Sequence, residues 1–134
     1  MSQSGNKFIK EMSLINLLPQ TIKEELRSKS LLKVISGLNN FDVQSVKTIV
    51  EAASLGGADL VDIACKPELV HLARQNSSLA VCVSSVVPQF FIDSVKAGAS
   101  LIEIGNYDTF YEKGIIFSDE KVLNLTKETR DLLP

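Results

Sequence analysis

The sequence predicts an α/β protein of parallel βα units, namely the first half (four βα units) of a TIM (β/α)8 barrel with an N-terminal helical extension. Three observations support this fold class. Short β-branched runs alternate four times with amphipathic helical runs after residue 30. A full barrel takes about 250 residues, or roughly 31 per βα unit, so 134 residues hold only four units after the extension. One face of every predicted strand carries a polar or ionisable residue, which a barrel interior can hold.

Length, composition and charge exclude several classes of protein. The 134 residues are 45% hydrophobic and 22% charged, which suffices for one globular domain with a core. The formal charge of -2, with basic residues scattered along the chain, gives no electrostatic footprint for nucleic acid. No apolar run approaches the roughly 20 residues that cross a bilayer, and residues 1–10 contain no apolar signal core. We therefore expect a soluble protein that has neither nucleic acid nor a membrane as partner.

The first thirty residues differ in character from the rest. Apolar residues recur at helical spacing from Phe8 to Ile15, Pro19 interrupts the pattern, and a charged helical pattern resumes from Thr21 to Lys29. We expect residues 1–30 to form a helical cap over the base of the sheet, and residues 31–134 to form the half-barrel.

Four strands and the helices after them are predicted by local signals. Asp42 is a good N-cap for the first helix, which Gly56 and Gly57 end. Pro67 and Pro88 open the second and third helices, and Gly98 ends the third. After the fourth strand a longer loop is expected, and Ser118 then opens a final helix. The strand candidates are Leu32–Ser36, Leu60–Ala64, Leu79–Ser84 and Leu101–Gly105.

Strand patterning favours a barrel over an open doubly wound sheet. Strands of an open sheet are apolar on both faces, because helices cover both sides. Here, apolar residues such as Val61 and Ile63 are expected to face the helices, and the other face carries Lys33, Asp62, Cys82 and Glu103 at matching positions. We expect the four strands to pair in sequential order, with Ile35, Ala64 and Leu101 also on this concave face.

The three charged residues of this face, Lys33, Asp62 and Glu103, are the catalytic or ligand-binding candidates of the barrel interior. A structural ion-pair network and a functional role are equally compatible with the pattern. A Schiff base on Lys33 would require a lowered pKa, whereas nearby acids raise it. Cys82 has no histidine partner in the pattern, so an inert buried cysteine is expected.

Polar residues at the carboxyl ends of the strands are the further ligand-binding candidates, because barrel sites form at that end. They are Asn39, Ser84, Ser85 and Asn106. For Asn39 and for the two serines, turn geometry and helix capping are the leading alternatives. The spacing of Cys65 and Cys82 does not indicate a metal site. Gly56-Gly57 precedes a strand and does not open a helix after one, so it does not indicate a cofactor-binding phosphate loop.

Four stretches in order carry a resemblance to a known family: KVISGLNNFD at 33–42, ADLVDIACK at 58–66, VCVSSV at 81–86 and GASLIEIGNY at 98–107. With them the chain resembles the hypothetical chloroplast reading-frame family numbered twenty-three, from algal plastids and cyanobacteria. The resemblance implies an aldolase-type, ribulose-phosphate-binding-like barrel in the plastid stroma, or in the cytoplasm if the source is cyanobacterial. It carries no catalytic assignment, and it implies another half-barrel beyond residue 134.

The function expected from these observations is binding of a small phosphorylated or sugar-like metabolite. The alternatives are a non-catalytic barrel for regulation or assembly, and a truncated inactive product. Half a barrel leaves two strand edges unpaired and apolar surface uncovered, so we expect either self-association or a missing C-terminal half-barrel as partner.

Overall fold

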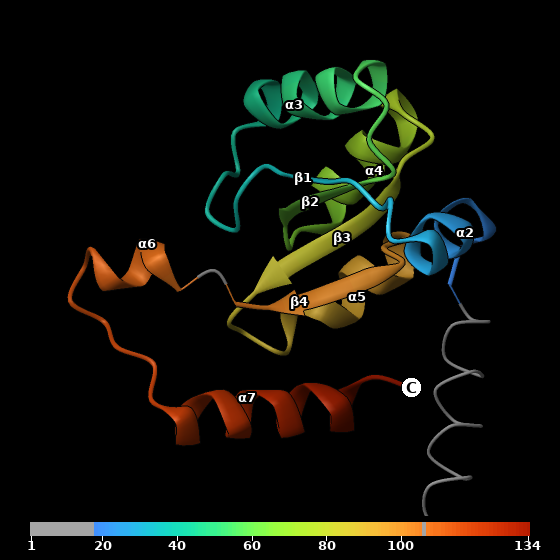
Figure 1. Ribbon diagram of the computed structural model, residues 1–134. Helices are drawn as coiled ribbons and strands as arrows, with labels where there is room; N and C mark the ends of the chain where they lie inside the picture. Colours follow the sequence, from blue (N-terminus) through green and yellow to red (C-terminus); the bar gives the residue numbers. More distant parts are fainter. Residues whose placement is uncertain (1–17, 106) are drawn as a thin grey trace, which may run out of the picture.

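The computed structural model describes residues 18–105 and 107–134, and it contains one parallel sheet (Figure 1). The strands are β1 (Lys33–Ile35), β2 (Leu60–Ala64), β3 (Ala80–Ser85) and β4 (Leu101–Ile104). Their spatial order is β1-β2-β3-β4, and each neighbouring pair is parallel. The predicted sequential parallel α/β architecture is therefore confirmed, whereas half of a TIM barrel stays a prediction.

Helices alternate with the strands, and their ends follow the expected signals in most places. Asp42 accepts a hydrogen bond from the Ser45 N–H at 2.7 Å, and Ser118 accepts one from the Lys121 N–H at 3.2 Å, so both are N-caps. Gly98 ends a helix with φ 116°, which a residue with a side chain rarely adopts. The helices are α2 (Gln20–Ser28), α3 (Val43–Leu55), α4 (Pro67–Asn76), α5 (Phe90–Ala97), α6 (Asp108–Tyr111) and α7 (Asp119–Leu132).

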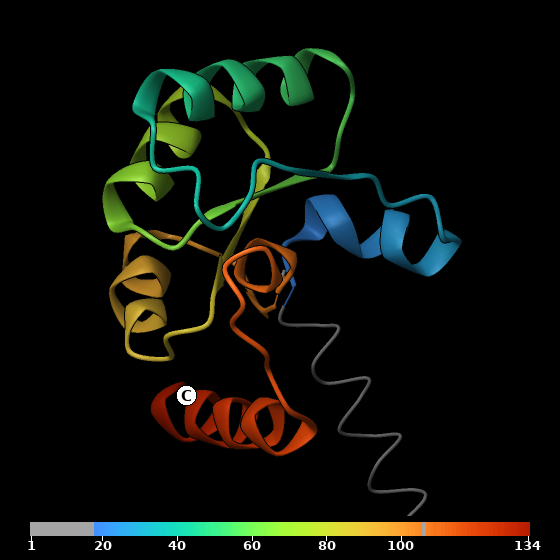
Figure 2. The same cartoon turned by 90° about the vertical axis from the view of Figure 1, so that its left-hand side faces the viewer.

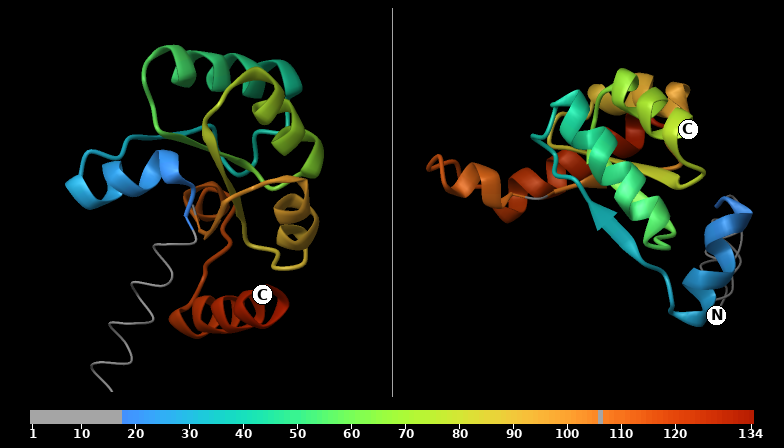
Figure 3. Two further views of the ribbon diagram at one scale, coloured as in Figure 1. Left: turned by 90° about the vertical axis from the view of Figure 1, so that its right-hand side faces the viewer. Right: turned by 90° about the horizontal axis from the view of Figure 1, so that it is seen from above.

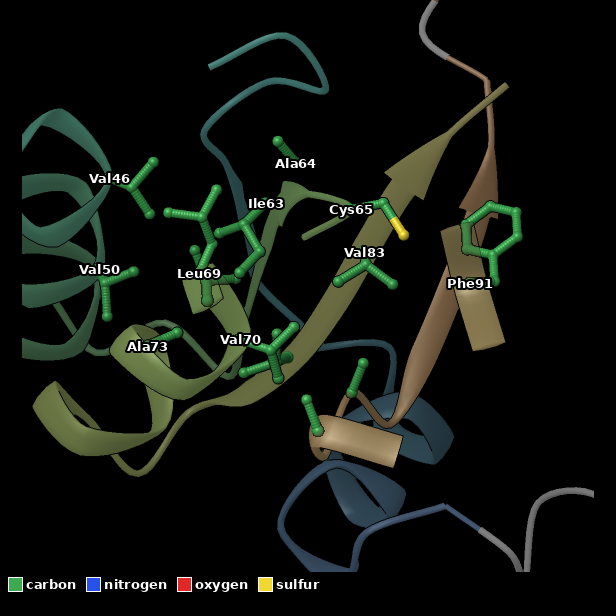
Figure 4. Close-up of a cluster of buried hydrophobic side chains, with 14 residues drawn as sticks. Val46, Val50, Ile63, Ala64, Cys65, Leu69, Val70, Ala73, Val83 and Phe91 are labelled. Carbon is green, nitrogen blue, oxygen red and sulfur yellow. The ribbon is translucent and has the colours of Figure 1, made fainter. Parts of the chain in front are cut away.

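One face of the sheet packs against α3, α4 and α5 and forms the main core (Figure 4). Val61, Ile63, Val81 and Val83 project from β2 and β3 with at most 1% of their surface exposed. Successive residues of a strand point to opposite faces of the sheet, so the residues between these four project from the other face. The predicted assignment of strand residues to faces is correct here.

The opposite face is covered near the amino ends of the strands by α2. Ile22 of this helix is 1% exposed and packs in a second cluster with Leu60, Ala80 and Cys82. The views from the two ends agree that α2 lies on the side of the sheet away from α3, α4 and α5 (Figures 2 and 3). The helical pattern expected from residue 21 is thus present as α2. The part of the expected cap at residues 1–17 lies outside the described residues, and the division at residue 30 into cap and half-barrel stays a prediction.

Helices α3, α4, α5 and α7 follow one another along an arc outside the sheet (Figure 2). The last of them, α7, is thinly packed, because Thr129 is its one buried residue. None of the helices in the described part of the chain is long and apolar enough to traverse a membrane.

Three expectations about local structure were wrong. The connection after β4 contains the short helix α6, where a plain loop was expected. The third predicted helix begins at Phe90, two residues after Pro88, because residues 88–89 form a turn first. Ala64 was expected to present surface on the concave face, but it is fully buried, although its register with Ser84 agrees with that face.

Candidate functional site

The charged side chains from three strands meet on the face of the sheet opposite α3, α4 and α5. The Lys33 ammonium donates a hydrogen bond to Glu103 Oε2, and its Nζ lies 4.0 Å from Asp62 Oδ2. The side chains of Lys33 and Glu103 are about one-third exposed, while that of Asp62 is almost completely buried. We call Lys33, Asp62, Ser84 and Glu103, one residue from each strand, the polar cluster.

Strand register explains why the Lys33–Glu103 contact requires a curved sheet. Lys33 is level with Leu60 and, through it, with Ala80, whereas Glu103 is level with Ser84, four residues further along β3. On a flat sheet, three strand spacings of about 4.8 Å and four rises of about 3.3 Å would separate the two Cα atoms by roughly 19 Å. The two side chains cannot span that distance, so the sheet coils toward the polar face.

Asp62 is the most buried member of the polar cluster. Its carboxylate accepts a hydrogen bond from Ser84 Oγ, which lies 2.6 Å from Oδ1 and 2.7 Å from Oδ2. Burial raises the pKa of the Asp62 carboxyl, and the Ser84 bond opposes that rise. The Ser84 hydroxyl is thus the donor that makes burial of this carboxylate tolerable.

Lys33 is held in its charged form by its surroundings. Its pKa is raised, principally by the hydrogen bond to Glu103, with burial acting in the opposite direction. A lysine that forms a Schiff base needs a lowered pKa. The ion pair with Glu103 therefore disfavours a Schiff base on Lys33.

Cys82 lies between β2 and β4 on the same face and is 4% exposed. Burial raises the pKa of its thiol well above the ordinary value, so the nucleophilic thiolate is suppressed. The ligand atoms of Asp62, Cys82 and Glu103 lie within 4.8 Å of one another, which is close enough for a metal ion. The Lys33 ammonium already lies against both carboxylates, so a cation bound to them would be repelled by this positive charge.

A cavity of about 250 Å³ opens at the carboxyl ends of β2 and β3, next to the polar cluster. It brings together three of the four predicted ligand-binding residues, Asn39, Ser84 and Ser85. Ser84 also belongs to the polar cluster, so the cavity and the cluster adjoin. The fourth candidate, Asn106, lies outside the described residues.

The predicted capping roles at this end are partly corrected. Ser85 Oγ accepts a hydrogen bond from the Val87 N–H at 3.0 Å, which stabilises a turn, and Ser84 bonds to Asp62. Neither serine caps α5, which begins without a side-chain cap. The turn chemistry expected of the Asn39-Asn40 pair falls on Asn40, whose Nδ2 donates to Ser36 and Ser45. Asn39 is exposed.

Apolar walls of the cavity were missed by the sequence reasoning, which considered polar residues only at the strand ends. Phe41, Phe90 and Phe110 line it, and Phe41 and Phe90 are 49% and 55% exposed. Phe41 and Phe90 also line an adjoining hollow of about 520 Å³. Phenylalanines shortly after two strands, one in a loop and one at the start of a helix, are the signal that could have indicated an apolar-walled pocket.

Comparisons with known proteins show which family this chain is similar to. Residues 17–134 match the pattern of a family described as "Protein of unknown function (DUF561)". "Uncharacterized protein ycf23" of Cyanophora paradoxa is 48% identical over 110 residues, which cover 81% of this chain and 45% of that protein. The proteins of the same name from Pyropia yezoensis and Antithamnion sp. are 35% and 38% identical, over 87% and 90% of this chain and 43% of each relative.

These matches confirm the resemblance noted from the sequence, at the level of the family. The chain spans less than half the length of the curated relatives it matches. No solved structure matches the chain, so the aldolase-type barrel that the resemblance implies stays a prediction.

Proposed function

This chain belongs to the DUF561 family, and from that premise we propose that it forms part of a barrel-type protein of the plastid that binds a small hydroxylated metabolite, sugar-like or phosphorylated. The observation that carries the proposal is the convergence of the polar cluster from four successive strands beside the cavity of Asn39, Ser84 and Ser85. The relatives come from algae and are plastid-type proteins, which supports the location.

The charges of the cluster favour hydroxyl groups over an anion as the bound chemistry. Lys33 contributes one positive charge, and Asp62 and Glu103 contribute two negative charges when ionised. This leaves the cluster with net negative charge, which would repel a phosphate group. Neighbouring sugar hydroxyls, in contrast, can donate hydrogen bonds to the carboxylates and accept one from the ammonium. If the ligand carries a phosphate, that group lies away from the cluster. In barrels a phosphate site is usually built by loops after strands seven and eight, beyond the four strands described here.

The cavity adds the apolar component that ligand pockets ordinarily have. Small-molecule sites combine apolar and aromatic walls with a few placed polar groups, and barrel sites open at the carboxyl ends of the strands. Phe41, Phe90 and Phe110 supply the walls, and the exposed amide of Asn39 lies at the rim with donors and an acceptor. A ligand seated there would reach the polar cluster through Ser84.

A thermal-shift screen tests the proposal. The probes are pentoses, pentose phosphates and inorganic phosphate, added to this chain and to the full-length Cyanophora paradoxa relative. A ligand at about one hundred times its Kd stabilises the folded state by about 2.7 kcal/mol, which is readily seen as a rise in Tm. We expect a sugar-type probe to raise Tm, and inorganic phosphate alone to raise the Tm of this chain little.

Variants separate a binding site from a structural ion pair. Lys33→Ala and Glu103→Gln should fold and lose the ligand-dependent rise in Tm, while the control Lys47→Ala, at an exposed helical lysine, keeps it. Loss of folding in both cluster variants would support the purely structural role, and absence of any rise with both proteins would support a non-catalytic assembly barrel or an inactive product.

A further inference from the structure

We propose that the two free edges of the sheet form one self-complementary interface, and that its occupant is a second copy of this chain. The inference concerns association and does not depend on the proposed ligand. Strands β1 and β4 each have one neighbouring strand, and no strand in residues 18–105 or 107–134 pairs with their outer sides. Unpaired strand edges of this kind are rarely left bare in native proteins.

The hydrogen bonds of the edge strands show which backbone groups point outward. Leu32 O accepts from the Asp59 and Leu60 N–H groups, and the Ser36 N–H donates to Asp62 O, so these residues bond toward β2. In a parallel strand the bonding direction alternates along the chain, so Lys33 and Ile35 present their backbone groups to the free side. Likewise the Ser100 N–H donates to Val81 O, and Leu101 and Glu103 therefore face outward from β4.

The β4 edge carries a groove that lacks a strand. A cavity of about 380 Å³ lies between β4 and the end of α5 on one side and α7 on the other. Ile102 and Ile104 contribute apolar side chains from β4, and Thr126 and Leu133 line the groove from α7. A helix that follows a strand normally covers the groove between that strand and the next one. Here α7 is in position, and no strand of the described residues lies on the outer side of β4 beneath it.

The β1 edge carries a groove that lacks a helix. A cavity of about 310 Å³ is lined by Val34 of β1, by Leu32 just before it, and by Ile49, Ala52 and Ala53 of α3. Leu32 is 51% exposed although it is a large apolar residue. Both β1 and the helix that follows it are present. The helix before β1, α2, lies on the other face of the sheet, so no helix of the described residues covers the outer side of this groove.

The two edges supply what each lacks. If β1 of a second copy pairs in parallel with β4, its Leu32 and Val34 enter the groove beneath α7, and α7 covers the groove beside the second copy's α3. The same pairing at the other two edges closes a two-fold ring of eight parallel strands, so neither copy retains a free edge. Because the sheet already coils toward the polar face, closure would also enclose the exposed parts of Lys33 and Glu103.

The mass of the chain in solution tests the proposal first. Size-exclusion chromatography with light scattering should give twice the 14.6 kDa of the chain at micromolar concentrations. A monomer, or a species that grows with concentration instead of stopping at a dimer, would overturn the proposal. A monomeric full-length relative beside a dimeric chain supports it, since the remainder of the relative then covers the same edges.

Matched variants locate the interface. Leu32→Asp puts a charge into the proposed contact at a half-exposed position, and we expect it to weaken the dimer Kd at least about tenfold. Leu55→Asp makes the same change at a 90% exposed position of α3 that lines neither groove, and it should leave the Kd within about twofold. Circular dichroism confirms that each variant folds. A dimer insensitive to Leu32→Asp uses another surface and contradicts the proposal.

Hydrogen exchange gives a second readout that needs no mutation. On dilution from dimer to monomer, the outward N–H groups of Ile35 and Leu101 should lose protection together, whereas the N–H of Ser36, already bonded to Asp62 O, should not. Equal behaviour of Ile35 and Ser36 across the dilution would contradict pairing at this edge.

Discussion

The two faces of the sheet bury their side chains for different reasons. On the helix side, Ile63 is fully buried among apolar neighbours, and its burial is stabilising through removal of apolar surface from water. On the other side, its sequence neighbour Asp62 is 2% exposed, and its burial costs free energy that Ser84 and Lys33 offset. The comparison shows that two equally buried residues of one strand can differ in energetic effect: one stabilises the fold by apolar packing, and the other requires polar partners on its own face.

Truncation of an isoleucine on each face should give the largest contrast. Ile63→Ala removes methylene groups from a filled core and should lower the free energy of unfolding by about 2–5 kcal/mol. Ile35→Ala makes the same change on the other face at a 54% exposed residue, and it should cost within about 0.5 kcal/mol. Urea denaturation of both variants at low protein concentration gives the two values, and equal costs would remove the distinction between the faces.

Loss of the Ser84 hydroxyl should have the next largest effect. Ser84→Ala leaves the buried Asp62 carboxylate without its hydrogen-bond donor, and the expected cost is about 1–3 kcal/mol at neutral pH. The control Ser28→Ala removes a hydroxyl whose bonds are all exposed, and should cost within about 0.5 kcal/mol. A Ser84→Ala variant as stable as Ser28→Ala would show that water already satisfies Asp62.

Asp62 should give the polar face a pH dependence of its own. Because burial raises the folded-state pKa of this carboxyl, its contribution to stability is fully present below the unfolded-state value of 3.8 and is lost as pH rises through the folded value. Relative to Asp62→Asn, the unchanged protein should therefore become more stable as the pH is lowered from neutral. Denaturation curves of the two proteins across the acidic range measure this difference, and the opposite sign would mean that Lys33 and Ser84 outweigh burial.

The smallest effect is expected for Lys33 at alkaline pH, because one-third of its side chain is exposed and solvent screens its charge. Its folded-state pKa is raised above the ordinary value of 10.5, so its stabilising contribution is present below that value and is lost as pH rises through the folded value. Lys33→Arg keeps the charge throughout this range. The unchanged protein should thus lose more stability than Lys33→Arg as the pH rises above that value, as measured by the free energy of unfolding against pH. Parallel curves for the two proteins would show that Glu103 and Asp62 do not raise the pKa of Lys33.

Local patterns in the sequence were sufficient to predict the order of the strands, most helix ends and the face of the sheet on which strand residues lie. Alternation along β2 separates Asp62 from Ile63 before any packing is known, and Asp42 and Ser118 are N-caps because their side chains reach N–H groups three residues away. Membership of the family was also determined by the sequence, through four stretches in order.

Contacts between distant residues were decided only by the tertiary structure. Lys33 and Glu103 are 70 residues apart in the chain, and their contact depends on how far the sheet coils. That coiling comes from the twist of all four strands and the packing of α3, α4 and α5 together. The sequence makes Ser84 a ligand-binding candidate with helix capping as the leading alternative, because no local signal shows that β3 places it against Asp62. Phe41, in the loop before α3, and Phe90, at the start of α5, likewise meet in the wall of one cavity because strand pairing brings the segments after β1 and β3 together, which local sequence does not show.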